Sequence, residues 1–321
     1  MSGGARFELT TLGEAMVQLA ASTAGPLRQV RSYDVHPAGS ELNVAIGAAR
    51  MGLAVSWIGA LGDDGFGDLL LSAARADAVD TSGVVRIPQA PTGVFFVQRG
   101  YPADGLSSSI YYRAGSAGSQ LSEAHLAGDH LARTDTFHTS GISLAVSPEL
   151  ANAARAAAAA AEAAGARCSF DVNFRAKLWS AQEARPAVEG ALERSHVAFC
   201  SLEDAGALWA VEQPEDAVEL LAGFGPAHAI VSCGADGAVM LAGGRLTRAE
   251  SPPIRVLDAT GAGDAFCATV LTGIARGWPA ETLLRRACVA GAIVCGVIGD
   301  NVGTPTLEEL ERAATDNWVY R

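Results

Sequence analysis

Short apolar runs alternate with longer helical patterns from about residue 40 to residue 300, and this alternation constrains the fold more than any other feature. Runs such as AVSWIGAL (54–61) and AHAIVSCG (227–234) are bounded by polar or glycine-containing residues, which is typical of buried strands. Strands that alternate with helices form βαβ units, so the sequence predicts an α/β fold with a mostly parallel sheet covered by helices on both faces. The predicted strands are 54–61, 135–142, 166–174, 196–202 and 227–234, and the predicted helices are 41–52, 64–76, 148–164, 181–194, 214–224, 262–276 and 280–296.

Two early segments interrupt this alternation. Residues 14–36 and 91–113 carry alternating apolar residues around Gly and Pro turns, which is typical of β-hairpins. We therefore expect a single α/β domain over residues 1–321, with the two hairpins forming a small separate sheet. The expected use of that sheet is a lid over the ligand site, and an interaction surface is the alternative.

Charge and cysteine content exclude several classes of function. The net charge of −12 repels nucleic acid and anionic membranes, so neither is expected as a partner. The six cysteines form no CxxC pair, which favours buried free thiols in a reducing compartment over a metal site or disulfides. The first residues lack the basic and apolar regions of a signal peptide, and no run is long enough to span a membrane. The expected location is the cytoplasm.

The stretch DATGAGDAF (258–266) combines permissive glycines with two aspartates where a helix is predicted to begin. Helix N-termini present backbone N–H groups, and Gly261, Ala262 and Gly263 let that backbone approach an anion such as phosphate. Asp264 would lie in the first helical turn, where a carboxylate can orient a hydroxyl and accept its proton during phosphoryl transfer. The alternative is that either aspartate only caps the helix. The absence of GxxxxGK[ST] excludes a P-loop protein, and the absence of GxGxxG after the first strand counts against a dinucleotide fold.

Two longer stretches resemble the signatures of a known family. DATGAGDAFCATVLTGIARG (258–277) resembles the C-terminal signature of the PfkB (ribokinase-like) carbohydrate kinases, and AGSELNVAIGAARMG (38–52) resembles their N-terminal glycine signature. The resemblance covers essentially the whole chain and implies a ribokinase-like fold, with a mostly parallel central sheet, flanking helices and a small β-sheet lid. It also implies ATP-dependent phosphorylation of a sugar hydroxyl with Mg²⁺, in which Asp264 is the general base and the 261–263 amides form the anion hole.

Two further stretches indicate which sugar is the expected substrate. IYYRAGSAGSQLS (110–122) and FDVNFRAKLW (170–179) resemble the 2-keto-3-deoxygluconate kinase branch of the family. In that branch the arginine at the position of Arg175 grips the carboxylate of the substrate, and a planar guanidinium suits that pairing. The resemblance thus implies phosphorylation of a terminal hydroxyl of 2-keto-3-deoxygluconate. The residues it assigns to the substrate are Gly39, Asn43, Phe95, Tyr111, Tyr112, Arg113, Arg175, Asp264 and Asp300.

Several of these substrate residues have a structural alternative. Tyr111 and Tyr112, on alternate faces of a strand, could serve cross-strand packing. Arg175 could form a surface ion pair. Phe95 stands where the branch often has a tyrosine, so the hydroxyl contact that a tyrosine would make to the sugar is absent here.

The nucleotide site follows from the same resemblance. SCGADGAV (232–239) resembles the strand–turn–strand that lies along ATP in the family. The residues assigned to ATP are Asn173, Arg175, Ser201, Ser232, Gly234, Ala235, Asp236, Gly237, Gly261, Gly263 and Cys288. SLED (201–204) stands where many relatives carry Asn-x-x-Glu, so Asp204 is expected to reach the Mg²⁺ ion only through water.

Two other functions stay open from the sequence. One is a kinase of the same family for fructose, ribose or 5-dehydro-2-deoxygluconate. The other is a sugar-binding regulator without turnover, against which the intact Gly261, Gly263 and Asp264 argue, since a binder needs no base. The expected partners are a small sugar acid and ATP, and a homo-oligomer through the lid is expected because an apolar lid sheet can pair with its twin.

Overall fold

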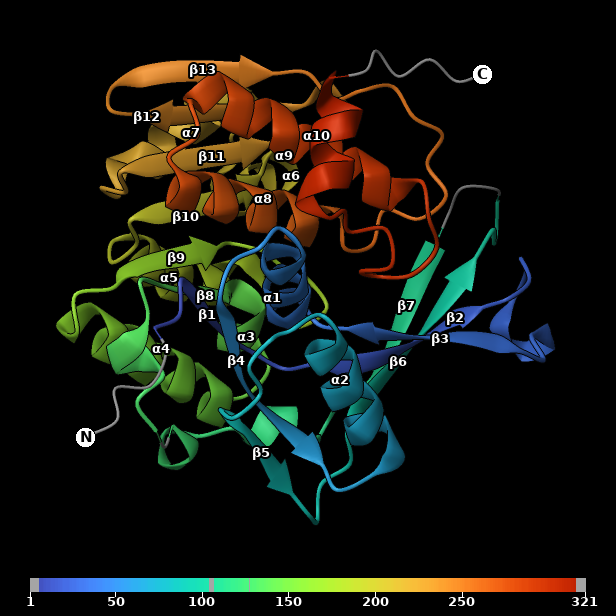
Figure 1. The fold of residues 1–321 in the computed structure, drawn as a ribbon. Helices are drawn as coiled ribbons and strands as arrows, with labels where there is room; N and C mark the ends of the chain where they lie inside the picture. The colour runs from blue at the N-terminus through green and yellow to red at the C-terminus, as the bar shows by residue number, and fades with distance from the viewer. Residues whose placement is uncertain (1–5, 104–106, 127, 316–321) are drawn as a thin grey trace.

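A computed structural model of the protein describes residues 6–103, 107–126 and 128–315. Nine strands form the main sheet in the order β13-β12-β11-β10-β9-β8-β1-β4-β5 (Figure 1). The pairings from β11 to β5 are all parallel, and β12 and β13 extend one edge in antiparallel fashion. The strands are β1 Leu9–Leu12, β4 Val55–Gly62, β5 Val84–Ile87, β8 Thr136–Ser140, β9 Arg167–Asp171, β10 Val197–Ser201, β11 His228–Ser232, β12 Ala238–Ala242 and β13 Arg245–Ala249.

Helices cover both faces of this sheet and enclose two apolar cores. The alternation of side chains along a strand explains the division, because Val197 and Phe199 of β10 join one core while Ala198 and Cys200 join the other. One core is covered by α1 Ser40–Arg50, α2 Gly65–Ala76, α8 Ala262–Arg276, α9 Ala280–Cys295 and α10 Leu307–Thr315. The other is covered by α3 Gly141–Ala145, α4 Pro148–Ala163, α5 Ala181–Leu192, α6 Leu202–Trp209 and α7 Pro214–Gly223.

The predicted α/β fold is confirmed, but four of the five predicted strands end earlier than expected, two of them at a serine that starts a helix. The run 135–142 leaves the sheet at Ser140, whose hydroxyl accepts a hydrogen bond from the Ile142 N–H and starts α3. The run 196–202 likewise ends at Ser201, which caps α6 by accepting from the Asp204 N–H. In both cases the hydroxyl of a serine at the strand end accepts a hydrogen bond from a backbone N–H that follows, and this bond starts the helix. The prediction also missed β1, β5, β13, α3, α6 and α10.

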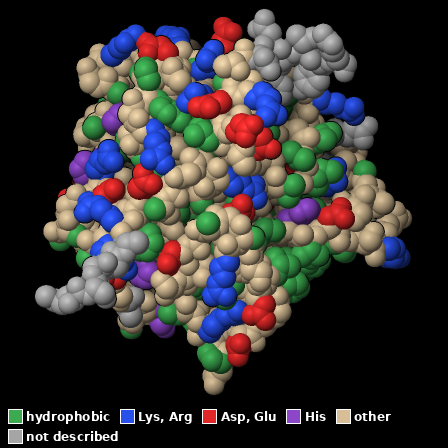
Figure 2. All heavy atoms as spheres, in the orientation of Figure 1, with side chains coloured by type: hydrophobic (Ala, Val, Ile, Leu, Met, Phe, Trp, Pro, Cys, Tyr) green, Lys and Arg blue, Asp and Glu red, His purple; other side chains and the backbone are tan. Residues whose placement is uncertain are grey.

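The two segments expected to be hairpins form a second, smaller sheet. Its strands are β2 Met16–Ala21, β3 Tyr33–Ala38, β6 Gly93–Arg99 and β7 Ser107–Tyr112, in the order β3-β2-β6-β7. Each hairpin pairs within itself in antiparallel fashion, and the two hairpins join through the parallel pair β2–β6. The sheet extends from one side of the main body in Figure 1, and Figure 2 shows hydrophobic side chains gathered in that region.

All six cysteines are free thiols, and four of them are buried. Burial raises the pKa of the Cys168 thiol to about 11 and of the Cys288 thiol to about 12, so these groups stay protonated and packed. None of the helices in the described part of the chain has the length and apolar character needed to cross a membrane.

Candidate active site

A cleft of about 1160 Å³ lies between the main sheet and the small sheet. Its main-sheet wall contains Asp171, Ser201 and Ser232, which are the last residues of β9, β10 and β11. Its opposite wall contains Phe95 of β6 and Tyr111 of β7. The carboxyl ends of parallel strands meet at one edge of a sheet, which is where ligands bind in open α/β folds.

Asp264 lies in the first turn of α8 and faces the cleft. Its two carboxylate oxygens accept hydrogen bonds from the Ser40 hydroxyl at 2.7 Å and from the Asn43 amide at 2.8 Å. These donors come from α1, so Asp264 is held by another helix and does not cap its own. Asp258 does not cap the helix either, because it accepts from the N–H of Thr260 at 3.0 Å and from its hydroxyl at 2.7 Å, and Thr260 precedes the N-cap Gly261.

A second carboxylate shares the same amide donor. Asn43 also donates to Asp300 at 2.9 Å, and Asn301 donates to the Asn43 carbonyl oxygen at 2.9 Å, which keeps the amide nitrogen turned toward both carboxylates. The N–H of Gly39 lies 3.4 Å from Asp300. Burial and the nearby Asp264 raise the pKa of Asp300 to about 7, and burial also raises the pKa of Asp264 against the lowering effect of its hydrogen bonds and Arg175.

The backbone just before Asp264 is shaped by one glycine. Gly261 is the N-cap of α8 at φ +80°, and a Cβ there would lie 1.6 Å from the carbonyl oxygen of Asp300. Only glycine allows both the left-handed conformation and this approach. Gly261 and Gly263 line the cleft, whereas the N–H of Ala262 donates to the Ala259 carbonyl at 3.3 Å. The predicted anion hole therefore has the amides of Gly261 and Gly263 at the cleft, and Ala262 behind them.

The loop after β9 brings further polar groups to the cleft. Asn173 has φ +37°, its N–H donates to Asp171 at 3.2 Å and its amide donates to the Ser40 hydroxyl at 3.0 Å. Ser40 therefore links Asn173 to Asp264. Burial raises the pKa of Asp171 to about 8, with the nearby Asp204 and Asp264 adding to the effect.

Arg175 follows in the same loop, is exposed and lines the cleft. None of the ion pairs among the described residues includes it, so the surface ion-pair alternative finds no partner. Burial raises the pKa of Asp204, and the positive charge of Arg175 opposes part of that rise. Two residues later Lys177, the only lysine in the sequence, donates to the Ser109 carbonyl of β7 at 2.8 Å and so bridges the two walls.

The predicted nucleotide residues divide into two groups. Asn173, Arg175, Ser201, Ser232, Gly234, Gly261 and Gly263 line the cleft. The described residues of its lining do not include Ala235, Asp236, Gly237 or Cys288. Ala235 and Asp236 lie at the exposed tip of the turn, and Gly237 is packed so closely that a Cβ would lie 2.0 Å from the Ala249 carbonyl oxygen.

The two tyrosines of β7 lie on opposite faces of the small sheet. Tyr111 faces the cleft and stacks on Phe95 with a centroid distance of 5.2 Å. Tyr112 packs edge-on against Phe96 at 5.7 Å and is 65% exposed. Because neighbouring side chains of a strand point to opposite faces, Tyr111 and Phe95 line the cleft and Tyr112 and Phe96 do not. The assignment of Tyr112 to the substrate is therefore not supported by its position, which fits the cross-strand packing alternative.

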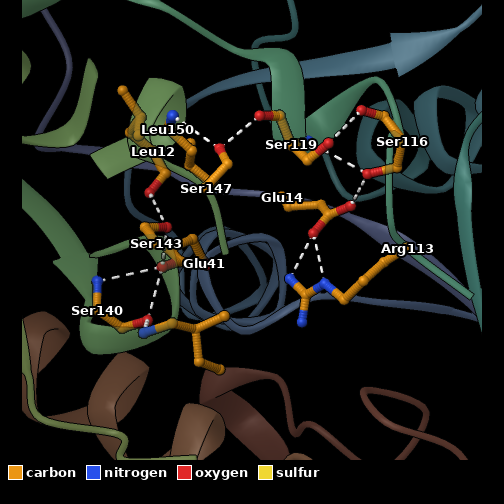
Figure 3. Close-up of polar contacts among 12 residues, drawn as sticks. Leu12, Glu14, Glu41, Arg113, Ser116, Ser119, Ser140, Ser143, Ser147 and Leu150 are labelled. Carbon is orange, nitrogen blue, oxygen red and sulfur yellow. Dashed lines mark hydrogen bonds and ion pairs between the residues drawn. The ribbon is translucent and has the colours of Figure 1, made fainter. Parts of the chain in front are cut away.

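Arg113 lines the cleft but is not free. Its guanidinium donates twice to the carboxylate of Glu14, from Nε at 2.8 Å and from Nη2 (Figure 3). The ion pair is buried, since Glu14 has no exposed side-chain surface and the Arg113 side chain is 11% exposed. The sequence analysis missed this carboxylate.

Sequence reasoning overlooked four other residues at the cleft or directly behind it. Ser40 and Asp171 stand inside the stretches AGSELN and FDVN, so the motifs themselves pointed to them. Lys177 was identifiable as the only lysine. Asn301 had no local signal, because its partner Asn43 is 258 residues away.

The described residues contain no group of three or more His, Cys, Asp or Glu side chains that could hold a metal ion by themselves. Asp204 lines the cleft, and its carboxylate accepts from the Phe174 N–H at 3.2 Å. A single carboxylate fits a metal ion that is held mainly by a ligand's oxygens and by water. The indirect role of Asp204 stays a prediction.

Comparison with known proteins agrees with this geometry. Residues 6–307 match the model of the pfkB family carbohydrate kinases. The chain is 37% identical to a 2-dehydro-3-deoxygluconokinase of Thermoproteus tenax, over 96% of this chain and 94% of the relative. It is 31% identical to a 2-dehydro-3-deoxygalactonokinase of Haloferax volcanii, over 95% and 96%. A crystal structure of a putative ribokinase II from E. coli in complex with ATP and Mg²⁺ superposes with a TM-score of 0.88 at 29% identity, covering 96% of this chain and 98% of that one.

Proposed function

This chain belongs to the pfkB family of carbohydrate kinases, and from that premise we propose that it phosphorylates a terminal hydroxyl of 2-keto-3-deoxygluconate, using ATP and Mg²⁺. The observation that carries the choice of an acid substrate is Arg175, a guanidinium at the cleft with no ion-pair partner among the described residues. A carboxylate is the group that a free planar guanidinium binds best. The names of the two relatives support the keto-deoxy acids as a class, in both the gluconate and the galactonate form.

Each residue of the cleft has a separate role in the proposed reaction. Asp264 orients the hydroxyl of the sugar and accepts its proton during transfer. Ser40 and Asn43 each bond one oxygen of this carboxylate, so the orientation is set before the substrate arrives. Asp300 is placed to accept a hydrogen bond from another sugar hydroxyl, and Arg175 binds the acid group. Tyr111 and Phe95 cover the sugar from the small sheet.

The cleft also fits the nucleotide. ATP bound with Mg²⁺ supplies the phosphoryl group that is transferred. The amides of Gly261 and Gly263 at the start of α8 would hold its phosphate oxygens, because a helix N-terminus attracts anions. Ser232 and Gly234, which line the cleft beside β11, would contact the remainder of the nucleotide.

The dependence of turnover on pH should reveal the protonation of the buried carboxylates in the cleft. A protonated Asp264 cannot accept a proton, and burial raises the pKa of Asp264 and brings that of Asp300 to about 7. We expect kcat/KM to fall with decreasing pH at values above the ordinary aspartate pKa of 3.8, because the pKa of Asp264 is raised. The change is read from rates between about pH 5 and 9. Asp300→Asn removes the neighbouring charge and should move this limb to lower pH, and an unmoved limb would contradict the coupling of the two groups.

The substrate is tested by ADP release with Mg²⁺-ATP and a panel of sugars. The panel contains 2-keto-3-deoxygluconate, its galactonate epimer, 5-dehydro-2-deoxygluconate, fructose and ribose. Turnover restricted to the keto-deoxy acids supports the proposal. Turnover of fructose or ribose alone would keep the kinase and reject the acid substrate, and binding without turnover would favour a regulator.

The same panel tests the role of Arg175. Arg175→Ala should raise KM for the keto-deoxy acids by about 10- to 100-fold, because a charge-assisted pair with the carboxylate is lost. Uncharged sugars should change by less than about threefold. Lys177→Ala is the matched control, since it removes a neighbouring cation that is bonded to a backbone carbonyl and should not discriminate acid from neutral sugars. Equal losses for both classes in Arg175→Ala would reject the carboxylate role.

The outer face of the small sheet supports a proposed homo-oligomer. Val35, Ile110 and Tyr112 are 46%, 47% and 65% exposed, and all three belong to this sheet. Pairing of this face with a second copy would cover them. We further propose a cytoplasmic location, which is consistent with the free thiols.

A further inference from the structure

Glu14 is a buried carboxylate in the connection between β1 and β2 that has no role in the mechanism above. Its side chain has no exposed surface. It accepts hydrogen bonds from Nε and Nη2 of Arg113 on one oxygen and from the Ser116 hydroxyl on the other (Figure 3). Both carboxylate oxygens are thus engaged by groups that follow β7.

The chain makes room for this carboxylate. A Cβ on Gly118 would lie 2.2 Å from Cγ of Glu14, and a Cβ on Gly93 would lie 2.9 Å from its Oε1. Gly118 therefore has to be glycine because of Glu14, and at position 93 a side chain would crowd both Glu14 and Met16. The packing around Glu14 is therefore built to hold a carboxylate in one place.

Serine side chains anchor this arrangement to the main body. Ser119 donates its N–H to the Ser116 hydroxyl at 3.2 Å and its own hydroxyl to the Ser116 carbonyl at 2.7 Å. Ser147, the N-cap of α4, donates to the Ser119 carbonyl. Figure 3 shows these contacts running from α4 to Glu14 and Arg113. The position of Glu14 is thereby tied to a helix of the main sheet.

One edge of the Arg113 guanidinium is hydrogen-bonded to Glu14, and the other edge is not. Arg113 has five N–H donors, and the two bonds to Glu14 use only Nε and one hydrogen of Nη2. The ring of Tyr111 lies 5.8 Å from Cζ and covers one face. Arg113 lines the cleft, and its remaining N–H groups have no hydrogen-bond partner among the described residues.

We propose that Glu14 is a positioning residue for the substrate, which fixes the guanidinium of Arg113 so that its unused edge meets the carboxylate of the sugar acid. This inference rests on the proposed function, in which the substrate carries a carboxylate bound by Arg175. Arg113 lines the same cleft and would contact that carboxylate together with Arg175. Glu14 also neutralises the charge of Arg113. The pair therefore recognises the substrate's carboxylate by the geometry of a planar, paired guanidinium, and an unpaired positive charge plays no part in that recognition.

Glu14→Gln tests the proposal, because glutamine keeps the size and loses the charge that holds the guanidinium. KM for the sugar acid should rise about 10- to 100-fold, as for a lost charge-assisted pair. Within the same variant, kcat and KM for ATP should stay within about threefold of the wild type. The double variant with Arg113→Met should be no worse than Arg113→Met alone, since Glu14 acts through Arg113.

Glu41→Gln is the matched control for the loss of a buried carboxylate. Glu41 accepts from the Ser140 hydroxyl at 2.7 Å and the Ser143 hydroxyl at 2.8 Å but contacts no arginine among the described residues. It should lower the melting temperature without a selective rise in KM for the sugar acid.

Ser116→Ala is the milder variant, and it tests the role of Glu14 if Glu14→Gln does not fold. It should raise KM by about 3- to 10-fold, because it removes one hydrogen bond to Glu14.

The outcomes separate this inference from the proposed function. If Arg113→Met raises KM but Glu14→Gln, or Ser116→Ala in its place, leaves it unchanged or lowers it, Glu14 does not position Arg113. If Arg113→Met itself has no effect on KM, the inference fails while the sugar panel still decides the substrate. A wild-type enzyme inactive on every sugar acid would reject the proposed function and the inference together.

Discussion

Replacing Asp264 by asparagine is expected to lower kcat by about 10²- to 10⁴-fold, the range for loss of a general base. Asparagine keeps the shape of the side chain and can still bond to Ser40 and Asn43, so the sugar should still bind. The measurement is kcat from ADP release, together with the Kd for the sugar acid by calorimetry. Turnover near that of the wild type would remove Asp264 as the base.

Asp300→Asn is the matched comparison for this experiment. Asp300 accepts from the same Asn43 amide and is buried, but it is assigned to substrate binding. Its replacement should act mainly on KM for the sugar, with a smaller loss in kcat than in Asp264→Asn. A larger loss of kcat in the Asp300 variant would exchange the roles of the two carboxylates.

Gly261→Ala is expected to have the second large effect, with kcat lowered by about 10²- to 10³-fold, as for a lost oxyanion-type donor. A Cβ at this position would lie 1.6 Å from the backbone oxygen of Asp300, so the loop must move away. That movement displaces the Gly261 and Gly263 amides from the phosphate position and disturbs Asp300 at the same time. The measurement is kcat, with the melting temperature as a check on folding.

Gly277→Ala controls for backbone strain in that experiment. Gly277 is the C-cap of the same helix at φ +66°, but no heavy atom lies within 4 Å of a Cβ placed there. It should lose about 1 kcal/mol of stability from the left-handed conformation and keep its kcat. If Gly261→Ala behaves like Gly277→Ala, the close approach to Asp300 does not matter for turnover.

The main sheet was predictable because its signal is local. The residues of β10, VAFCS, alternate between two apolar cores, and the flanking helices repeat their apolar residues every three to four positions. Such patterns can be read from near neighbours in the sequence. The capping roles of the serines that end β8 and β10 were overlooked, because each acts through a single hydrogen bond to a backbone N–H.

The candidate site was predictable where a residue belongs to a motif. Asp264, Gly261, Asn173 and Arg175 line the cleft as the motifs indicated. Tyr112 was not distinguishable from Tyr111, because which of two neighbouring strand residues faces the cleft depends on how the small sheet docks. The exposed Ala235 and Asp236 show the same limit for a turn, whose direction no local pattern specifies.

The sequence by itself determined the layers of the fold, the helix start at the glycines and the candidate base, because each depends on residues close together in the chain. Only the tertiary structure decided that Asp264 and Asp300 share the amide of Asn43, across 221 and 257 residues. It also decided that Arg113 is held by Glu14, 99 residues away. Contacts at such separations depend on how whole elements pack against one another. A side chain's partner, and with it its charge state and orientation, is therefore settled only when the sheets and helices have come together.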